Sequence, residues 1–193
     1  MKIFPLVPAR LVGFGLLALA VVAAAGCGIL SPKKGGGDPP KPFEYPALTT
    51  PESTLANVGY AWERRDSSRT KQIYDDQYLG TSTDLTDVTP TTLTYYKYQE
   101  VGVVSAMQRR SEISRVTMDL KRPTWIRLHY NSDPAGWTAI QITGVNIQVD
   151  DTQYGTQLAN SSTTFEFKFK PTVDHTSPTD TTWQVVGWTE TRQ

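Results

Sequence analysis

Two ionisable side chains lie where a base and the group that orients it could meet. Asp119 lies near the end of a predicted strand over 114–120, and His129 lies in the next predicted strand, over 125–130. A carboxylate beside an imidazole can move a proton, so this pair is a candidate catalytic site. Both residues also fall on the polar side of their strands, close to basic residues such as Arg115. An exposed strand face of mixed charge therefore stays open as the other interpretation.

The composition excludes several functional classes. The 193 residues include 19 basic and 19 acidic side chains, two His and one Cys. A formal charge of zero argues against a polybasic surface, so no nucleic-acid partner is predicted. Two His and one Cys cannot form the usual four-ligand zinc site, and one Cys cannot form an internal disulfide. The sequence has no phosphate-binding glycine loop, no catalytic GxSxG or HExxH pattern and no calcium loop, so it predicts neither a metal nor a cofactor.

The single cysteine, Cys27, follows a segment that is typical of secretion signals. Lys2 and Arg10 precede an apolar run of 15 residues over 11–25. This run is short for a transmembrane helix but suits the hydrophobic region of a signal peptide. Ala24-Ala25-Gly26-Cys27 resembles the lipobox of bacterial lipoproteins, although that family usually has Leu where Ala24 stands.

The lipobox resemblance implies that residues 1–26 are removed and that Cys27 receives acyl chains such as palmitate. Membrane lipid is then the expected partner of the N-terminus. Gly28 stands where an inner-membrane lipoprotein of a Gram-negative cell has Asp, so the resemblance favours the outer membrane, facing the periplasm. An ordinary signal peptide and an N-terminal transmembrane anchor remain as alternatives. Residues 27–48 are rich in Pro and Gly and are predicted to be a flexible tether.

Helices are predicted to come first in the folded domain, over 49–193. Thr50-Pro51-Glu52 has the order of a helix start, with an N-cap, a proline at the first helical position and an acid in the first turn. A second helix is predicted from Asp66 to Tyr78. Segment 84–92 is predicted to be a loop, and a third helix is predicted over 95–110.

From Ser111 onward the hydrophobic period changes to two, which indicates strands. The predicted strands span 114–120, 125–130, 137–149, 163–170 and 182–191. The alternation changes phase at Gly144, which predicts a bulge that bends one long strand. Phe165, Phe167 and Phe169 share one face of their strand.

Three N-terminal helices before a long, bent antiparallel sheet resemble the nuclear transport factor 2-like, or SnoaL-like, cone. Segment 50–66 looks like the family's first helix and the Arg-Asp turn that ends it. Segment 183–188 looks like its closing strand, although Gly187 and Thr189 replace the usual Arg and Glu. The resemblance implies an α+β fold whose helices pack against the sheet. A β-sandwich or a lipocalin-like barrel is the competing architecture, and it fits the strands but not the helices.

The resemblance also implies a pocket between the helices and the sheet. Catalytic members of the family place a carboxylate or His base there, beside a Tyr or acid donor. Glu100 and Tyr74 therefore join Asp119 and His129 as candidates, with Asp119 and His129 as the favoured pair. A fold alone does not establish an activity.

Two hypotheses of function follow. The first is a non-catalytic envelope lipoprotein that binds a small apolar ligand or a protein partner. On this hypothesis the side chains of Phe165, Phe167 and Phe169 are accessible on an open face of the sheet. The resemblance also implies that two copies of the chain can form a homodimer through this face. The second is a small isomerase, cyclase or hydratase, which requires Asp119 and His129 to face an enclosed pocket.

Overall fold

The computed structural model describes residues 42–86, 89–120, 125–159, 164–174 and 177–192. One compact unit spans Glu44–Gln193. The predicted signal peptide, Cys27 and the first part of the predicted tether lie outside the described residues. Among the residues that are described, no helix is both long enough and apolar enough to cross a membrane.

Three helices and nine strands make up the described part of this unit. In chain order they are α2 (Pro51–Glu63), α3 (Ser67–Ile73), β1 (Tyr74–Asp84), β2 (Thr91–Tyr96), α4 (Lys97–Arg109), β3 (Ile113–Met118), β4 (Trp125–Leu128), β5 (Thr138–Thr143), β6 (Ile147–Asp151), β7 (Gly155–Ala159), β8 (Thr164–Asp174) and β9 (Ser177–Arg192).

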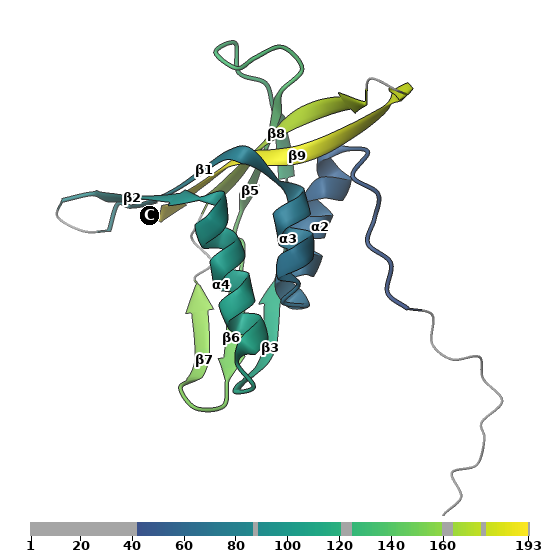
Figure 1. Cartoon of the computed structure of the whole chain (residues 1–193). Coiled ribbons are helices and arrows are strands. Elements are labelled where there is room, and N and C mark those ends of the chain that lie inside the picture. Colours follow the sequence, from purple (N-terminus) through teal and green to yellow (C-terminus); the bar gives the residue numbers. More distant parts are fainter. Residues whose placement is uncertain (1–41, 87–88, 121–124, 160–163, 175–176, 193) are drawn as a thin grey trace, which may run out of the picture. The chain divides into compact units, whose positions relative to one another are not determined.

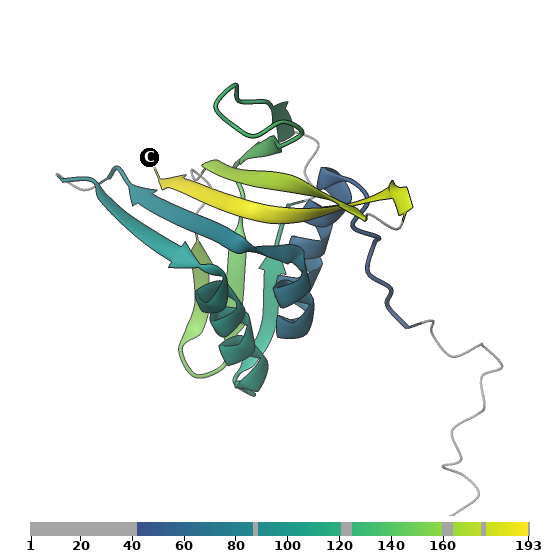
Figure 2. The same cartoon turned by 45° about the horizontal axis from the view of Figure 1, so that its top comes forward.

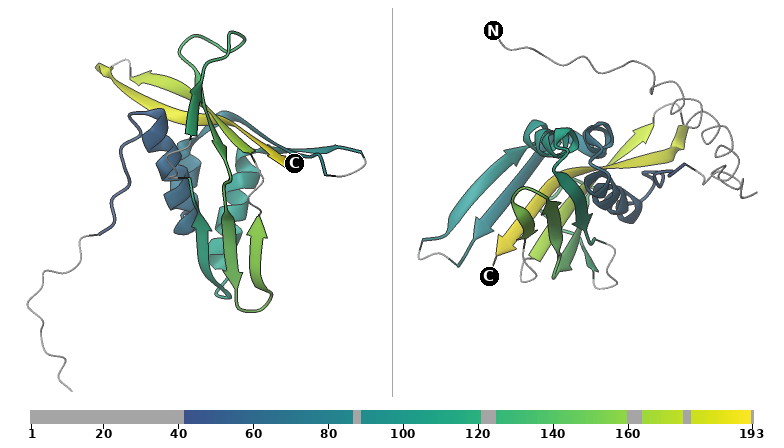
Figure 3. Two further views of the ribbon diagram at one scale, coloured as in Figure 1. Left: turned by 180° about the vertical axis from the view of Figure 1, so that it is seen from behind. Right: turned by 90° about the horizontal axis from the view of Figure 1, so that it is seen from below.

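The strands form two sheets that enclose the core together with the helices. Six strands pair in the order β2-β1-β9-β8-β5-β4, and three pair in the order β3-β6-β7. β1 runs parallel to β9, and the other pairs are antiparallel. The large sheet lies across one end of the helices (Figure 1), and the small sheet stands beside them (Figure 3, left). The predicted α+β class, with three helices against a curved and mainly antiparallel sheet, is confirmed.

Helix α2 begins where its capping residues predict. The Thr50 hydroxyl accepts a hydrogen bond from the Ser53 amide at 3.1 Å, and Pro51 occupies the first helical position. The apolar side chains of Leu55, Val58 and other residues on the same face of α2 are buried in the core. The cap satisfies a free amide at the helix end, so it helps to set the start of α2.

The second predicted helix is shorter than expected. Asp66 caps α3 through the Arg69 amide at 2.8 Å, but the helix ends at Ile73. From Tyr74 the chain is strand β1, which pairs with both β2 and β9. Tyr74 and Tyr78 are four residues apart, a spacing that fits the inner face of a helix or of a strand. Pairing between distant strands decides between the two.

Strand β2 begins at the end of the loop predicted over 84–92 and runs into the start of the helix predicted over 95–110. β2 pairs with β1 in an antiparallel hairpin. This hairpin separates α3 from α4, whereas the sequence predicted three helices before the first strand. Helix α4 follows β2 directly, and the Tyr96 amide at its start donates to Gln99 Oε1 at 2.9 Å. This order places α4 next to β1 and β2, where it packs.

The long bent strand predicted around Gly144 is two strands in different sheets. β5 belongs to the large sheet and β6 to the small one. Gly144, between them, has a φ of +71°, a conformation that side-chain-bearing residues rarely adopt. The phase change in the sequence therefore marks a change of sheet rather than a bulge.

Replacing Gly144 with Ala should destabilise the fold by about 1–2 kcal/mol, because a Cβ strains the left-handed conformation. Urea unfolding of the two proteins, followed by circular dichroism, measures this loss. An unchanged midpoint would show that the turn between β5 and β6 tolerates another backbone conformation.

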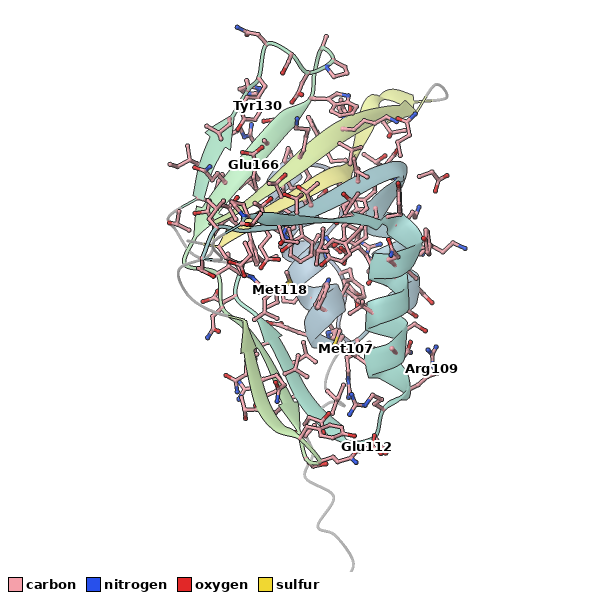
Figure 4. The ribbon with its side chains drawn as sticks, turned by 90° about the vertical axis from the view of Figure 1, so that its left-hand side faces the viewer. Met107, Arg109, Glu112, Met118, Tyr130 and Glu166 are labelled. Carbon is pink, nitrogen blue, oxygen red and sulfur yellow. The ribbon has the colours of Figure 1, made fainter. Side chains whose placement is uncertain are left out.

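Strand β8 has the alternation that the sequence predicts. Its three phenylalanines are buried, and Glu166, on the opposite face, accepts a 2.6 Å hydrogen bond from the Tyr130 hydroxyl. Figure 4 shows this pair on the outer side of the large sheet, away from Met107 and Met118 in the interior. The hydrogen bond to Glu166 and burial raise the pKa of Tyr130 to about 12. The polar face of β8 is thus an outer surface.

The folded unit begins slightly before the predicted boundary at residue 49. The Leu48 carbonyl accepts a hydrogen bond from the Trp183 amide at 2.7 Å, and its side chain packs against the core. The Tyr45 hydroxyl donates to Asp66 at 2.9 Å. Residues 45–48 therefore belong to the fold rather than to the tether.

Candidate functional site

A cavity of about 290 Å³ opens between α4, the end of α2, and strands β1, β2, β6 and β9. Figure 2 shows β1 and β9 side by side above α4. The residues that line the cavity are Trp62, Tyr78, Gly80, Thr81, Ser82, Tyr95, Gln99, Glu100, Val103, Ile147, Trp188, Glu190 and Arg192. Its size suits a small organic ligand rather than a peptide.

A buried tyrosine–glutamate pair lines this cavity. The Tyr78 hydroxyl donates to Glu100 Oε1 at 3.1 Å, and the two residues are 2% and 9% exposed. Among the described residues, the second oxygen of Glu100 has no protein partner. A nearly buried carboxyl with a free oxygen in a cavity can bind a polar group of a ligand.

Burial changes the protonation of this pair. Burial is the main cause that raises the pKa of Glu100 to about 7; the hydrogen bond from Tyr78 opposes the shift, and the nearby Glu190 carboxylate adds to it. Burial also raises the pKa of Tyr78, with smaller effects of Tyr74 and Glu100. Near neutral pH the Tyr78 phenol is therefore neutral, and Glu100 is divided between its two forms.

The position of the Tyr78 phenol depends on a glycine two residues later in β1. A Cβ at Gly80 would lie 2.5 Å from the Tyr78 hydroxyl oxygen. The Tyr78 ring also contacts the Tyr74 ring, with ring centroids 4.6 Å apart. Gly80 thus leaves the space in which Tyr78 reaches Glu100.

Two tryptophans form part of the cavity wall. Trp62 of α2 and Trp188 of β9 meet edge to face, with ring centroids 6.0 Å apart and an interplanar angle of 73°. Trp188 also packs against Phe165 and Phe167 of the neighbouring strand. The phenylalanine core therefore supports this wall from behind.

Charged residues of β9 complete the lining. Arg192 Nε lies 2.8 Å from Glu190 Oε1, and the two side chains form an ion pair. Glu190 also stands close enough to Glu100 to disfavour its ionised form. The cavity therefore has one guanidinium, already paired, and two carboxyl groups.

The favoured catalytic pair, Asp119 and His129, lies elsewhere. Asp119 follows β3 in the small sheet, and His129 follows β4 in the large one. The two strands were predicted to be neighbours, and this prediction is wrong. Both residues are exposed, and neither lines the cavity. The nearest polar group that the structure gives His129 is the Trp137 carbonyl, 3.4 Å from its Nδ1. The structure does not supply the enclosed pocket that the catalytic hypothesis requires of them.

The expectation of an accessible phenylalanine row is wrong. Phe165, Phe167 and Phe169 are at most 1% exposed. They face the enclosed side of the large sheet and belong to one core cluster with residues of α2 and β1. They cannot bind a partner directly, but they support Trp188.

Of the two remaining candidates, Glu100 lines the cavity and Tyr74 lies in the hydrophobic core. The Tyr74 side chain is fully buried and does not line the cavity. Tyr78 is not among the residues that the sequence predicted for the site, because it stood at the end of the second predicted helix. The available signal in the sequence is an aromatic residue two positions before Gly80. Within the described residues, no three His, Cys, Asp or Glu side chains lie close enough together to hold a metal ion.

No family model matches the chain, and no curated protein sequence matches it. Solved structures do resemble it. One is an NTF2-like protein of unknown function in nutrient uptake from Rhodospirillum rubrum, at 11% identity and a TM-score of 0.45, over 72% of this chain and 95% of that one. Another is a ketosteroid isomerase-like protein from Erwinia carotovora atroseptica, at 14% identity and a TM-score of 0.41, over 75% of this chain and 94% of that one. At these values no function is transferred from either protein.

Proposed function

We propose that this protein binds a small, mainly apolar ligand with one polar group in the cavity beside Glu100. The observation that supports this is a buried carboxyl with a free oxygen in an aromatic-lined cavity. An unpaired buried polar group lowers stability, so its presence here favours a role in binding. The aromatic walls contribute apolar contact area, and Glu100 orients the ligand.

Val103→Trp tests the proposal. Val103 lines the cavity from α4 and is 47% exposed, so a larger side chain can enter the opening without disturbing the core. N-phenyl-1-naphthylamine, a neutral dye that fluoresces in apolar sites, should bind the unmodified protein. Its affinity for the Val103→Trp variant should fall at least tenfold, because indole occupies the space for the ligand.

Ala106→Trp is the matched control. Ala106 is exposed on the same helix and does not line the cavity, so dye affinity should stay within twofold. Equal dye binding by both variants, or no binding by the unmodified protein, would contradict the proposed function.

We also propose that the domain is held to the cell envelope through lipid on Cys27. The support is the sequence alone: Cys27 is the one cysteine and directly follows a signal-like segment. Several acyl chains contribute ~0.8 kcal/mol for each buried CH₂ and so anchor a protein durably. In a Gram-negative host the anchor would lie in the outer membrane, with the domain in the periplasm.

Intact-mass measurement of the protein from the membrane fraction tests the anchor. The mass should equal that of a chain starting at Cys27 plus acyl groups, and Cys27→Ser should release the protein into the soluble fraction. A mature chain with an unmodified Cys27 thiol would refute the lipid anchor and leave ligand binding unaffected.

Proton transfer is the second candidate function. It is favoured by the pKa of Glu100, which is close to 7, because a base works best when its pKa is near the working pH. Glu100 would take the proton, in place of the Asp119 and His129 pair. Deuterium exchange into 2-tetralone, followed by nuclear magnetic resonance, should be faster with the unmodified protein than with Glu100→Gln. Equal rates would exclude this role.

A further inference from the structure

The cavity has the parts of an aromatic cage. Trp62, Tyr78, Tyr95 and Trp188 come from α2, β1, β2 and β9, and all four line the same space. Trp62 and Trp188 stand nearly perpendicular, so their rings do not stack flat on each other across the cavity. A cation in a cavity lined by aromatic side chains is attracted to each ring that turns its electron-rich face toward it.

The carboxyl in this cage has no counter-ion of its own. Glu100 forms no ion pair among the described residues, and its one hydrogen-bond donor is the neutral Tyr78 phenol. The basic residue of the lining, Arg192, is held by Glu190. A positively charged ligand would therefore supply the partner that the chain does not give to Glu100.

We propose that the polar group of the ligand is a cationic nitrogen, an amine or quaternary ammonium on an apolar body, held by the four aromatic side chains and Glu100. This inference rests on the proposed function, since it names the class of ligand for the same cavity. An anionic ligand fits poorly, because Glu100 and Glu190 would both repel it and Arg192 is already engaged.

The cation inference predicts a direction for the pH dependence of binding. A cation favours ionised Glu100, so its affinity should rise as the pH rises through 7. The titratable and charged groups around Glu100 are Tyr74 and Tyr78 of β1, Tyr95 of β2, and Glu190 and Arg192 of β9. A neutral ligand that accepts a hydrogen bond from protonated Glu100 should show the opposite dependence.

Choline and its neutral isostere 3,3-dimethylbutan-1-ol test the inference. The two differ in charge but hardly in shape, and each can compete with N-phenyl-1-naphthylamine. We expect choline to bind at least tenfold more tightly than the alcohol at pH 8, and to lose at least tenfold between pH 8 and pH 5.5. Glu100→Gln should abolish this pH dependence and most of the preference for choline, whereas Glu44→Gln, at an exposed site, should change neither.

Three outcomes would overturn the inference: equal affinity for the two probes, tighter choline binding at pH 5.5, or displacement of the dye by neither. In each case the proposed function is judged separately. If the dye still binds and Val103→Trp still blocks it, the cavity binds apolar ligands of another polar class. If the dye does not bind, the proposed function fails as well.

Discussion

Glu100→Gln is expected to raise the free energy of unfolding by about 3 kcal/mol at pH 8 and to change it little at pH 4. Burial raises the pKa of Glu100 in the folded protein to about 7, from an ordinary value of 4.5. Between these two values the folded protein keeps a proton that the unfolded chain has released. The stability that this proton provides is present below pH 4.5 and is lost as the pH rises through 7. Gln mimics the protonated acid and can still accept the Tyr78 hydrogen bond.

Urea unfolding at pH 4, 6 and 8 measures this effect. Between pH 4 and pH 8 the stability of the variant should increase by about 3 kcal/mol relative to that of the unmodified protein. Glu44→Gln is the control, since Glu44 is exposed and its replacement should leave the pH dependence unchanged. Parallel curves for the unmodified and Glu100→Gln proteins would show that Glu100 is not held in an environment that opposes its ionisation.

The expected gain in stability links Glu100 to function rather than to folding. A glutamine, or an apolar residue that fills the same space, would suit the core better at neutral pH. A group that lowers stability and faces a cavity is typical of a binding or catalytic site. The choline experiment and the unfolding experiment therefore test two consequences of the same buried carboxyl.

Elements whose signals are local could be predicted from the sequence. The start of α2 follows from Thr50 and Pro51, and the two faces of β8 follow from the alternation of phenylalanine with charged residues. These patterns depend on neighbours within one turn or one strand. The sheets to which the strands belong depend on pairing between distant segments, so the separation of β5 from β6 could not be predicted.

The candidate site depends on such distant pairing. Glu100 could be chosen from the sequence, but its partner Tyr78 reaches it only because β1 is a strand between β2 and β9. The sequence favours Asp119 and His129 as a pair because their predicted strands follow each other in the chain. Those strands enter different sheets, so closeness in sequence did not become closeness in space.

Gly80→Ala is the second change with a large expected effect. The new Cβ would lie 2.5 Å from the Tyr78 hydroxyl oxygen and 3.1 Å from the ring carbon that bears it. Tyr78 is packed against Tyr74 and cannot move without loss of contact. We expect a loss of about 2 kcal/mol in stability, since overpacking a core costs 1–3 kcal/mol. Dye affinity should fall as well, because the displaced phenol no longer holds the shape of the cavity.

A double-mutant cycle with Tyr78→Phe identifies the clash as the cause. Tyr78→Phe alone leaves Glu100 without its donor and should cost about 1–3 kcal/mol. Tyr78→Phe also removes the hydroxyl oxygen that the new methyl group of Gly80→Ala meets. The loss of stability in the double variant should therefore be at least about 1 kcal/mol smaller than the sum of the losses in the two single variants. Gly102→Ala on α4 is the control of opposite sign: its methyl group meets no atom within 4 Å, and helix propensity should stabilise the protein by about 0.5–1 kcal/mol. Additive losses in the cycle would mean that Gly80 is needed for the backbone of β1 and not for the place of the Tyr78 phenol.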